Sequence, residues 1–576
     1  MISPFTRIAL AGALIFVLSA ASPAVAAART GAQVAEIAAA AERAWAALTD
    51  PVTGAVYDRL QPGPHTTRDF NYGTFMLADA QLRTAARTGD GALAAKAVGH
   101  VLGFANLRSG VAPGDPFSQL AAGTLIADGR AGRLPADAWA RIHEPLEQMA
   151  RRILPFTGHG FDDPQRFDNW RLVWAAAAVQ LAQAGIVGEP GAITENPAAL
   201  RAEVVRIVNE LVPANGGPVV RTPYGSGRAL SDRPDQPLAY HVFSAVLLER
   251  IYQSDPAVFG PAALAVREQM GNYALALMAP DGDLTPSGRS IQQSWVLGAA
   301  ADLGAMRAGQ GGPSAGRWRA FAERAVERLV RVHGTFADGT IPTLPGFMVT
   351  SDPAIADHYN SMSQYNGLTL FFLQHAADQW PDHVALAPLA GDRDLLMADL
   401  GSGGPALAWG RAGNVWWAIQ GRNTRPDSRA TQGIVALKVR TPAGWRDRLA
   451  SRPLKSTPRT DFLLRTRSGA QARLELTSAS GSGRRAVLTG RWVTATGRIH
   501  RTARWDVRVR GSHLIVTTEP MRSGERLSAA LWATAEARRA QTNARVSSTR
   551  CIVSASGRAC PRTLRHKRPG RVRVTL

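Results

Sequence analysis

The sequence has few of the residues and motifs that mark metal sites and common enzyme classes. Its two cysteines, Cys551 and Cys560, lie near the C-terminus without a histidine-rich motif beside them, so we expect no metal site. In an oxidising compartment they would form one local disulfide, and elsewhere they would stay two thiols. No GxSxG, HExxH, Walker or dinucleotide-binding glycine pattern stands out. This argues against serine hydrolases, zinc proteases and nucleotide-dependent enzymes, and we expect no cofactor.

Long apolar runs are also scarce, and the one that exists lies at the N-terminus. Residues 1–27 combine an early arginine, the run IALAGALIFVLSA and an Ala24-Val25-Ala26 end, which is typical of a secretory signal peptide. An uncleaved anchor is the alternative, but the run is shorter than the ~20 residues that a spanning helix needs. We therefore expect a secreted monomer, extracellular or associated with the cell wall, without stable membrane insertion after signal cleavage.

Acidic residues are few in the last third of the chain. Residues 401–576 hold 35 Lys and Arg against 8 Asp and Glu, so the excess positive charge of the chain, +21 in all, lies in this region. A surface of this kind attracts polyanions. The alternative is that the many arginines only keep the outward face of a sheet solvated. Because the protein is expected outside the cell, we expect no natural nucleic-acid partner.

Residues 28–384 have the pattern of a repetitive helical region. Apolar residues recur every three or four positions in segments that Gly, Pro and Asp separate. No fixed period of sequence identity links these segments, which argues against a solenoid. Segments 174–186 and 295–306 are apolar nearly all round, as inner helices of a closed ring are. We expect an (α/α) toroid of about six helical hairpins, with helices near 31–48, 71–88, 91–107, 116–128, 136–153, 168–185, 197–212, 236–254, 261–279, 289–308, 315–333 and 362–378, and with longer loops at 154–167, 213–235, 280–288 and 334–361.

Residues 385–576 change to short alternating segments separated by Gly, Ser, Asn and Asp. This predicts an antiparallel β-sandwich with one polar, arginine-rich face. Residues 505–519 predict a hairpin with a Gly-Ser turn.

Several predicted helices begin with polar residues that an apolar ring would otherwise exclude. Tyr240 and His241 lie on the first turn of one inner-type helix. Their alternatives are packing for Tyr240 and a hydrogen bond to a loop carbonyl for His241. Asp168 can cap the helix predicted near 168–185. This leaves Asn169 and Arg171, with Trp170 between them, able to bind an anionic group. Side chains at such entrances meet in one cleft if the helices alternate between inner and outer positions.

Two further helix entrances carry the same kind of residue. Tyr365 and Asn366 open one helix, with His358 and Tyr359 on the loop before it. Arg289 is predicted on the first turn of another helix, followed by Gln292 and Gln293. A cation there opposes the helix dipole, so Arg289 needs an anionic partner, either a nearby aspartate or a substrate carboxylate.

These patches and the order of the two regions resemble exported polysaccharide lyases of the chondroitin AC/hyaluronate, heparinase and alginate lyase groups. The patches are DNWRLVWA (168–175), PLAYHVFSAVLL (237–248), DGDLTPSGRSIQQSW (281–295) and HYNSMSQYNGL (358–368). The Asn-Asn-His run of some alginate lyases is missing, and no single family's full signature is present. The resemblance implies β-elimination on an acidic polysaccharide without a metal.

The resemblance also implies roles for the residues at the helix entrances. Asn169 and Arg289 would neutralise a uronic acid carboxylate, while His241, Tyr240 or Tyr365 would move protons. The remaining residues would bind substrate, namely Trp170, Arg171, Gln292, Gln293, His358, Tyr359 and Asn366.

Two alternatives remain open at this stage. A glycoside hydrolase on the same toroid would need two carboxylates about 5–10 Å apart. The candidates are Asp162, Asp163, Asp168, Asp281, Asp283, Asp352 and Asp357. A non-enzymatic protein would instead bind acidic glycans or wall polymers through the basic C-terminal region, with strong salt sensitivity.

Overall fold

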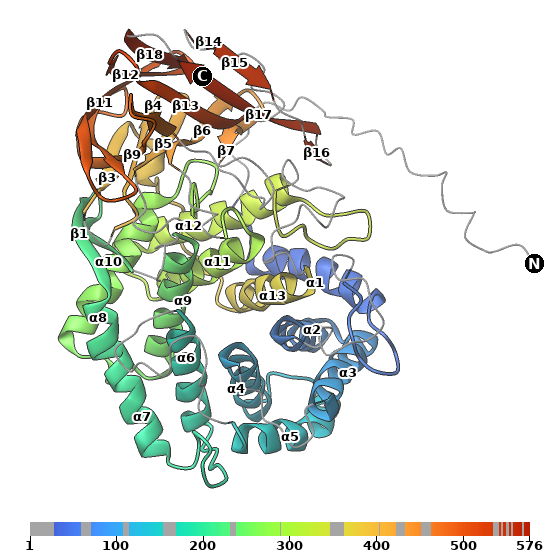
Figure 1. Ribbon diagram of the computed structural model, residues 1–576. Coiled ribbons are helices and arrows are strands. Elements are labelled where there is room, and N and C mark those ends of the chain that lie inside the picture. Colours follow the sequence, from blue (N-terminus) through green and yellow to red (C-terminus); the bar gives the residue numbers. More distant parts are fainter. Residues whose placement is uncertain are drawn as a thin grey trace, which may run out of the picture.

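A computed structural model describes most of the chain and confirms the predicted order of helices followed by antiparallel strands (Figure 1). Among the described residues no helix is long and apolar enough to cross a membrane. The predicted signal peptide, residues 1–27, and Cys551 of the predicted disulfide lie outside the described residues. Those residues are 28–58, 71–107, 115–153, 169–230, 238–288, 290–345, 362–401, 404–421, 432–450, 462–533, 541–542, 545–548, 552–554, 557–566 and 570–576.

Six of the described helices form a closed inner ring. Each packs against the next, and the last packs against the first. The inner helices are α2 (Tyr72–Thr88), α4 (Pro116–Arg130), α6 (Asn169–Gln183), α9 (Leu238–Ser254), α11 (Ser294–Gly309) and α13 (Met362–Asp378). Nearly every residue of α9 and α11 is buried, as expected for helices that are apolar on all sides.

An outer helix accompanies each inner helix, which makes the predicted set of helical hairpins. The outer helices α5 and α12 have one charged face and one buried apolar face. The outer set is α1 (Gly31–Ala47), α3 (Gly91–Leu107), α5 (Ala136–Arg151), α7 (Pro197–Arg206), α10 (Pro261–Leu277) and α12 (Ala315–Arg328), with short extensions η1 (Ile207–Leu211), α8 (Val212–Ala214), η2 (Pro256–Val258) and η3 (Leu329–His333).

Two glycines let the ring close between α2 and α13. A Cβ atom on Gly367 would lie 1.8 Å from the carbonyl oxygen of Gly73, and a Cβ on Gly73 would lie 2.2 Å from the Cα of Gln364. Only glycine permits such an approach of two helix backbones. Asn71 caps α2 by accepting hydrogen bonds from the backbone N–H groups of Gly73 and Thr74, at 2.8 and 3.3 Å.

Residues 216–230, predicted as part of a long loop, form a β-hairpin instead. Strands β1 (Gly216–Thr222) and β2 (Gly225–Leu230) pair antiparallel, with Gly225 at a φ of 110° in the turn. The sequence GGPVVRT contains glycine and proline, which the strand pattern disfavours, so local propensity did not reveal it. The hairpin packs against α10 and against the start of α9.

The C-terminal strands form one antiparallel ladder that folds over a shared core. β13 pairs with both β7 and β8 and so joins two layers, while Trp417 donates a hydrogen bond across the core to the carbonyl of Gly483 at 3.0 Å. The predicted hairpin turn at Gly511 lies between β11 and β12. The strands are β3 (Leu395–Asp399), β4 (Leu407–Ala412), β5 (Val415–Gln420), β6 (Gly433–Thr441), β7 (Gly444–Ala450), β8 (Phe462–Arg465), β9 (Gln471–Gly481), β10 (Arg485–Thr494), β11 (Ile499–Arg510), β12 (His513–Met521), β13 (Arg526–Ala533), β14 (Gln541–Thr542), β15 (Arg545–Ser548), β16 (Ile552–Ser554), β17 (Gly557–His566) and β18 (Gly570–Thr575), after the short helix η4 (Ala390–Asp392).

The strand region packs on the helical region through an apolar interface. Residues of α10, β2 and the start of α9 contact strands β3 to β6 in one buried cluster. Trp409 of β4 donates a hydrogen bond to the carbonyl of Ala276 at 3.1 Å. This interface brings the strand layer against the segment that precedes α11.

Candidate active site at the N-terminal end of the helical ring

Every inner helix carries an aromatic side chain within its first four residues. Ring contacts join the first turns of α2, α4 and α6 and those of α9, α11 and α13, and the close approach of Gly73 to Gly367 joins α2 to α13. The six helices therefore begin at the same end of the ring. The six aromatic residues are Tyr72, Phe117, Trp170, Tyr240, Trp295 and Tyr365. We call this set the aromatic rim.

Direct ring contacts link the aromatic rim into two groups of three residues. Tyr72 stacks on Phe117 with centroids 4.4 Å apart, and Trp170 meets the edge of Phe117 at 5.3 Å. Trp295 lies between the two other phenols, 5.5 Å from Tyr240 and 6.5 Å from Tyr365. Tyr72 and Trp170 are only partly buried. Flat aromatic faces of this kind pack against the C–H faces of sugar rings.

The segment that precedes α11 provides a polar contact to Tyr240. Its phenolic oxygen lies 3.2 Å from the Oγ of Ser290, within hydrogen-bond distance. Ser290 has a φ of 59° and Gln292 a φ of 52°, both in the left-handed region that residues other than glycine seldom adopt. Strained backbone persists only where surrounding contacts enforce it, and such positions cluster at functional sites. The strain therefore marks the wall of the site next to Tyr240.

A buried group of five charged residues enforces that backbone. Lys438 of β6 places its Nζ 2.9 Å from Asp281 and 3.0 Å from Asp283 and also pairs with Asp447 of β7. Arg328 of α12 pairs with Asp281 and lies 3.5 Å from Asp447. We call these five residues the interface charge cluster.

Gln292 connects the strained segment to the interface charge cluster. Its Nε2 donates to Asp283 and its Oε1 accepts from Arg328, each at 3.2 Å, and its backbone N–H donates to Thr285 Oγ1 at 2.7 Å. The strand region thus takes part in shaping this wall through Lys438 and Asp447.

Attraction outweighs burial for most of the interface charge cluster. Burial alone would lower the pKa of Lys438, but the three carboxylates raise it above its usual value. Burial opposes ionisation of Asp281, yet Arg328 and Lys438 hold the pKa of Asp281 well below its usual value. Asp447 differs, because burial raises its pKa. Opposite charges therefore favour the ionised forms of Lys438 and Asp281, whereas burial opposes ionisation of Asp447.

The prediction that His241 faces the cleft is wrong. His241 is 1% exposed and meets the edge of Tyr273 on the outer helix α10 at 5.0 Å. Its Nδ1 accepts the backbone N–H of Leu230 at 3.1 Å, which places the ring proton on Nε2. Burial lowers the pKa of His241 to about 4. The imidazole is therefore a neutral packing residue beneath the β-hairpin. Adjacent residues on a helix point 100° apart, so only Tyr240 of the pair reaches the ring interior.

Asn366 also belongs to the protein interior. It is fully buried, and its Oδ1 accepts from Trp45 Nε1 at 3.0 Å and from the backbone of Ile341 at 3.1 Å. Its Nδ2 donates to the carbonyl of Ile341 at 2.8 Å. This side chain fixes the segment at Ile341 on α1 and α13, so the predicted substrate contact is corrected to a structural one.

The other predicted residues lie in three situations. Asn169, Arg171 and Tyr365 are buried on first turns of inner helices, at the same end as Tyr240. Helix α11 begins at Ser294, so the predicted start of this helix at residue 289 is wrong; Gln292 precedes the helix and Gln293 is its N-cap. Arg289 itself, His358 and Tyr359 lie outside the described residues, as do Asp162, Asp163, Asp168, Asp352 and Asp357.

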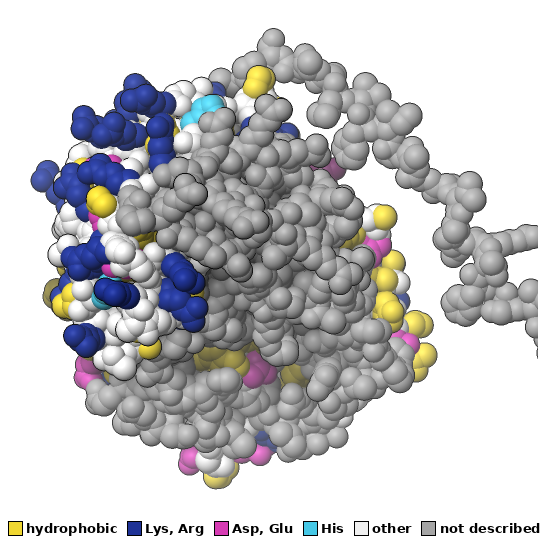
Figure 2. Space-filling model, turned by 45° about the horizontal axis from the view of Figure 1, so that its top comes forward, with side chains coloured by type: hydrophobic (Ala, Val, Ile, Leu, Met, Phe, Trp, Pro, Cys, Tyr) yellow, Lys and Arg dark blue, Asp and Glu magenta, His cyan; other side chains and the backbone are white. Residues whose placement is uncertain are grey.

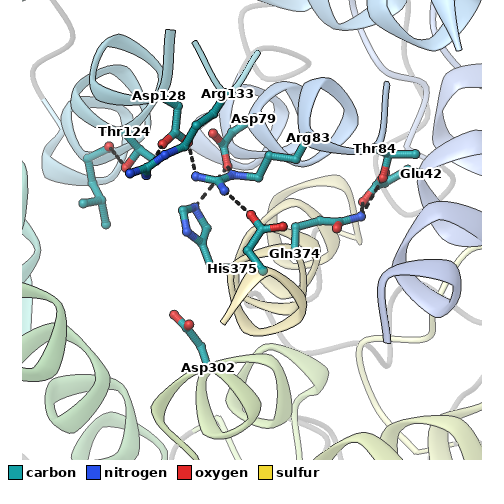
Figure 3. Close-up of polar contacts among 12 residues, drawn as sticks. Glu42, Asp79, Arg83, Thr84, Thr124, Asp128, Arg133, Asp302, Gln374 and His375 are labelled. Carbon is teal, nitrogen blue, oxygen red and sulfur yellow. Dashed lines mark hydrogen bonds and ion pairs between the residues drawn. The ribbon is translucent and has the colours of Figure 1, made fainter. Parts of the chain in front are cut away.

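A polar cavity opens at the opposite end of the ring, where the inner helices end. It encloses about 900 Å³ and is lined by arginine, aspartate, glutamine and histidine side chains, among them Arg87, Asp128, Arg250 and His375. Arg83 pairs with Asp128 and Asp378 and lies 3.2 Å from Asp79 (Figure 3). The cavity's side chains come from the far ends of separate helices, so no local sequence pattern predicts this cavity.

Arg83 pairs with two of the three side chains that could otherwise hold a metal ion here. Asp79, Asp128 and His375 bring ligand atoms within 4.8 Å of one another, but the Arg83 guanidinium binds both aspartates (Figure 3). Burial and four surrounding arginines hold the pKa of His375 well below its usual value. A positive field of this kind opposes a divalent cation, so the group is an ion-pair network.

Comparisons with known proteins find likeness in the arrangement of the chain only. No protein-family model matches the sequence, and no curated protein matches it. Chondroitin AC lyase of Streptomyces coelicolor, solved with chondroitin sulphate, is 11% identical over 96% of this chain and 80% of its own, with a TM-score of 0.48. Heparan sulfate lyase from Pedobacter heparinus is 12% identical over 90% of this chain and 78% of its own, with a TM-score of 0.42. A family 88 glycosyl hydrolase from Bacteroides vulgatus is 13% identical and covers 61% of this chain and 99% of its own, with a TM-score of 0.36.

Proposed function

We propose that this protein is a polysaccharide lyase that cleaves a uronic-acid-containing polymer by β-elimination at the aromatic rim. The supporting observation is the placement of Tyr240, a phenol within hydrogen-bond distance of Ser290 on strained backbone and packed against Trp295 of the aromatic rim at 5.5 Å. A sugar ring can stack on the rim while the phenol reaches its reacting carbon.

The chemistry requires proton transfers and neutralisation of a carboxylate. A base removes the proton on C5 next to the uronate carboxylate, the C4–O bond breaks as the C4–C5 double bond forms, and the departing oxygen takes a proton. The carboxylate's charge opposes the carbanion, so a neutral amide or a cation beside it lowers the barrier. In this proposal Tyr240 and Tyr365, on either side of Trp295, move the protons, and Asn169 binds the carboxylate. Arg289, next to Ser290 in the chain, remains a proposed second carboxylate partner.

Hydrolysis is the second candidate, because solved toroids include glycoside hydrolases. It needs two available carboxylates at the site. Among the described residues, Asp281 and Asp283 are both buried in the interface charge cluster, where Lys438 and Arg328 hold them. Because these two carboxylates are held in ion pairs, elimination is favoured over hydrolysis by that pair.

A panel of purified polymers tests the reaction type. Polyuronates, glycosaminoglycans and a neutral glucan of similar length are incubated with the protein, and two products are followed. Elimination yields an unsaturated uronate that absorbs in the ultraviolet and appears in step with new reducing ends. New reducing ends without ultraviolet absorbance would establish hydrolysis. If no polymer yields either product, the proposed function is wrong.

A further inference from the structure

One face of the sheet formed by β9 to β12 and β18 presents a row of arginines. Residues of β11 alternate between buried and outward positions, and the outward ones include Arg504, Arg508 and Arg510. Figure 2 shows Lys and Arg side chains gathered over this part of the molecule, with few Asp or Glu side chains among them.

The acidic side chains on this face are already paired. Glu475 holds Arg491 at 2.8 Å, and Asp506 lies 3.5 Å from Arg504. Glu519 accepts from Trp492 Nε1 at 2.5 Å and from the backbone of Arg504 at 2.9 Å. Other arginines on the face therefore have no acid left to neutralise them.

Four exposed arginines form the unneutralised part, which we call the arginine patch: Arg484, Arg485, Arg508 and Arg510. Within the described portion of the chain, no carboxylate lies within ion-pair distance of any of them. Arg485 on β10 is the direct register partner of Arg508 on β11. Side chains in this relation have Cβ atoms about 5 Å apart, and like charges directly opposite are destabilising. The arginine patch therefore lowers the stability of the free sheet.

We propose that the arginine patch binds a linear anionic polysaccharide at a site separate from the aromatic rim. A polymer with regularly spaced carboxylate or sulfate groups lies along the strands and relieves the repulsion between Arg485 and Arg508. Planar guanidinium groups suit this purpose, because each can donate two hydrogen bonds to one carboxylate or sulfate.

The choice of a polysaccharide rests on the proposed function, whereas the charge pattern alone fits any polyanion. Single-stranded nucleic acid is disfavoured because single strands are held by aromatic stacking. Trp492 and Trp505, which belong to the same strands, are fully buried. Among the described residues of the strand region, Ile499 is the only large apolar side chain that is exposed. A surface of guanidinium groups without exposed rings suits a polymer that lacks bases.

The test compares two double variants that lose the same charge. Arg485→Gln with Arg508→Gln alters the arginine patch, and Arg141→Gln with Arg221→Gln removes two exposed arginines of the helical region. Binding of the full chain to polygalacturonate is measured at low and high ionic strength, with neutral dextran as a blank. We expect the patch variant to bind about tenfold to thirtyfold more weakly at low salt and the control variant to bind as the wild type does. Equal losses in both variants would overturn the proposal, as would tighter binding of a single-stranded DNA oligonucleotide than of polygalacturonate.

Thermal unfolding gives an independent readout with the opposite sign. Without polymer at low salt, the patch variant should unfold at a higher temperature than the wild type, because the Arg485–Arg508 repulsion is gone. Polygalacturonate should then raise the unfolding temperature of the wild type by more than that of the patch variant, which keeps only the weaker binding and the proposed site at the aromatic rim. An unfolding temperature that falls in the patch variant would contradict the proposed strain. Turnover of a short oligouronate separates this site from the proposed function: patch binding without turnover in any variant would refute the lyase and leave the patch standing.

Discussion

Replacing Lys438 by methionine tests how the strand region shapes the candidate site. Lys438 is fully buried, and its Nζ contacts three carboxylates, two of them at 2.9 and 3.0 Å. Methionine fills a similar volume but carries no charge. The substitution removes one of the two cations of the interface charge cluster, so Asp281, Asp283 and Asp447 keep Arg328 as the cluster's remaining cation.

The structure sets both the size and the pH dependence of the effect. Removing one partner of a buried ion pair costs about 3–5 kcal/mol, because the remaining charge stays desolvated. This is a large part of the ~5–15 kcal/mol by which domains are stable. Burial already raises the pKa of Asp447 in the wild type, and loss of Lys438 raises it further. A carboxyl whose folded pKa is raised loses stability as pH rises, so the cost of the substitution is largest above neutrality and shrinks as Asp447 protonates.

Urea unfolding at pH 8 and pH 5 measures this effect. We expect the loss in unfolding free energy to be about 3–5 kcal/mol at the higher pH and clearly smaller at the lower one. The double variant Lys438→Met, Asp447→Asn should recover part of the loss, since it removes one charge of each sign. Lys96→Met is the matched control, because Lys96 is half-buried and its Nζ donates to the carbonyl of Thr49 at 3.2 Å, with no carboxylate in ion-pair distance among the described residues. An unchanged stability at pH 8, or an equal loss at both pH values, would refute the reasoning.

Three further predictions concern the helical ring. Burial raises the pKa of Glu42 to about 8, so the stability of the wild type declines as pH rises from the unfolded pKa of about 4.3 towards 8. Glu42→Gln should therefore raise the unfolding temperature at pH 8 and leave it nearly unchanged at pH 5. An equal shift at both pH values would contradict this. His241→Asn keeps an acceptor for the Leu230 N–H, so it should retain both stability and turnover while His241→Phe loses stability; a well-folded His241→Asn protein without turnover would return His241 to the active site. The wild type should not be stabilised by Zn²⁺ at Asp79, Asp128 and His375, whereas Arg83→Ala should gain a zinc-dependent rise in unfolding temperature; a rise in the wild type instead would show that Arg83 does not block the position.

The helical ring was predictable because its signal is local and repeated. Apolar spacing and flanking Gly, Pro and Asp residues marked α2, α9 and α13 within two residues of their observed bounds. The start of α11 was set five residues too early, because the segment RSIQQ has no helix breaker. Its left-handed Ser290 and Gln292 depend on charges from the strand region, which no local pattern encodes.

The candidate site was predictable only in part, for the same reason. Helix entrances pointed to Tyr240 and Tyr365, but which of Tyr240 and His241 faces the ring depends on the position of α10. Tyr72, Phe117 and Trp295 were missed, although an aromatic residue in the first turn of every inner helix was a readable signal. Lys438 gave no signal, because it looks like an outward residue of an alternating strand until its partners from another region are known.

The central claim is that chemistry takes place at Tyr240 on the aromatic rim. Its most direct test compares Tyr240→Phe with Tyr252→Phe, two substitutions on α9 that each remove one hydroxyl, on whichever polymer the wild type cleaves. Tyr252 packs against Phe259 and Arg267 away from the rim. We expect turnover to fall about 10²–10⁴-fold in Tyr240→Phe, the usual contribution of a proton-transferring side chain, and to stay unchanged in Tyr252→Phe. Wild-type turnover in a correctly folded Tyr240→Phe protein would contradict the account.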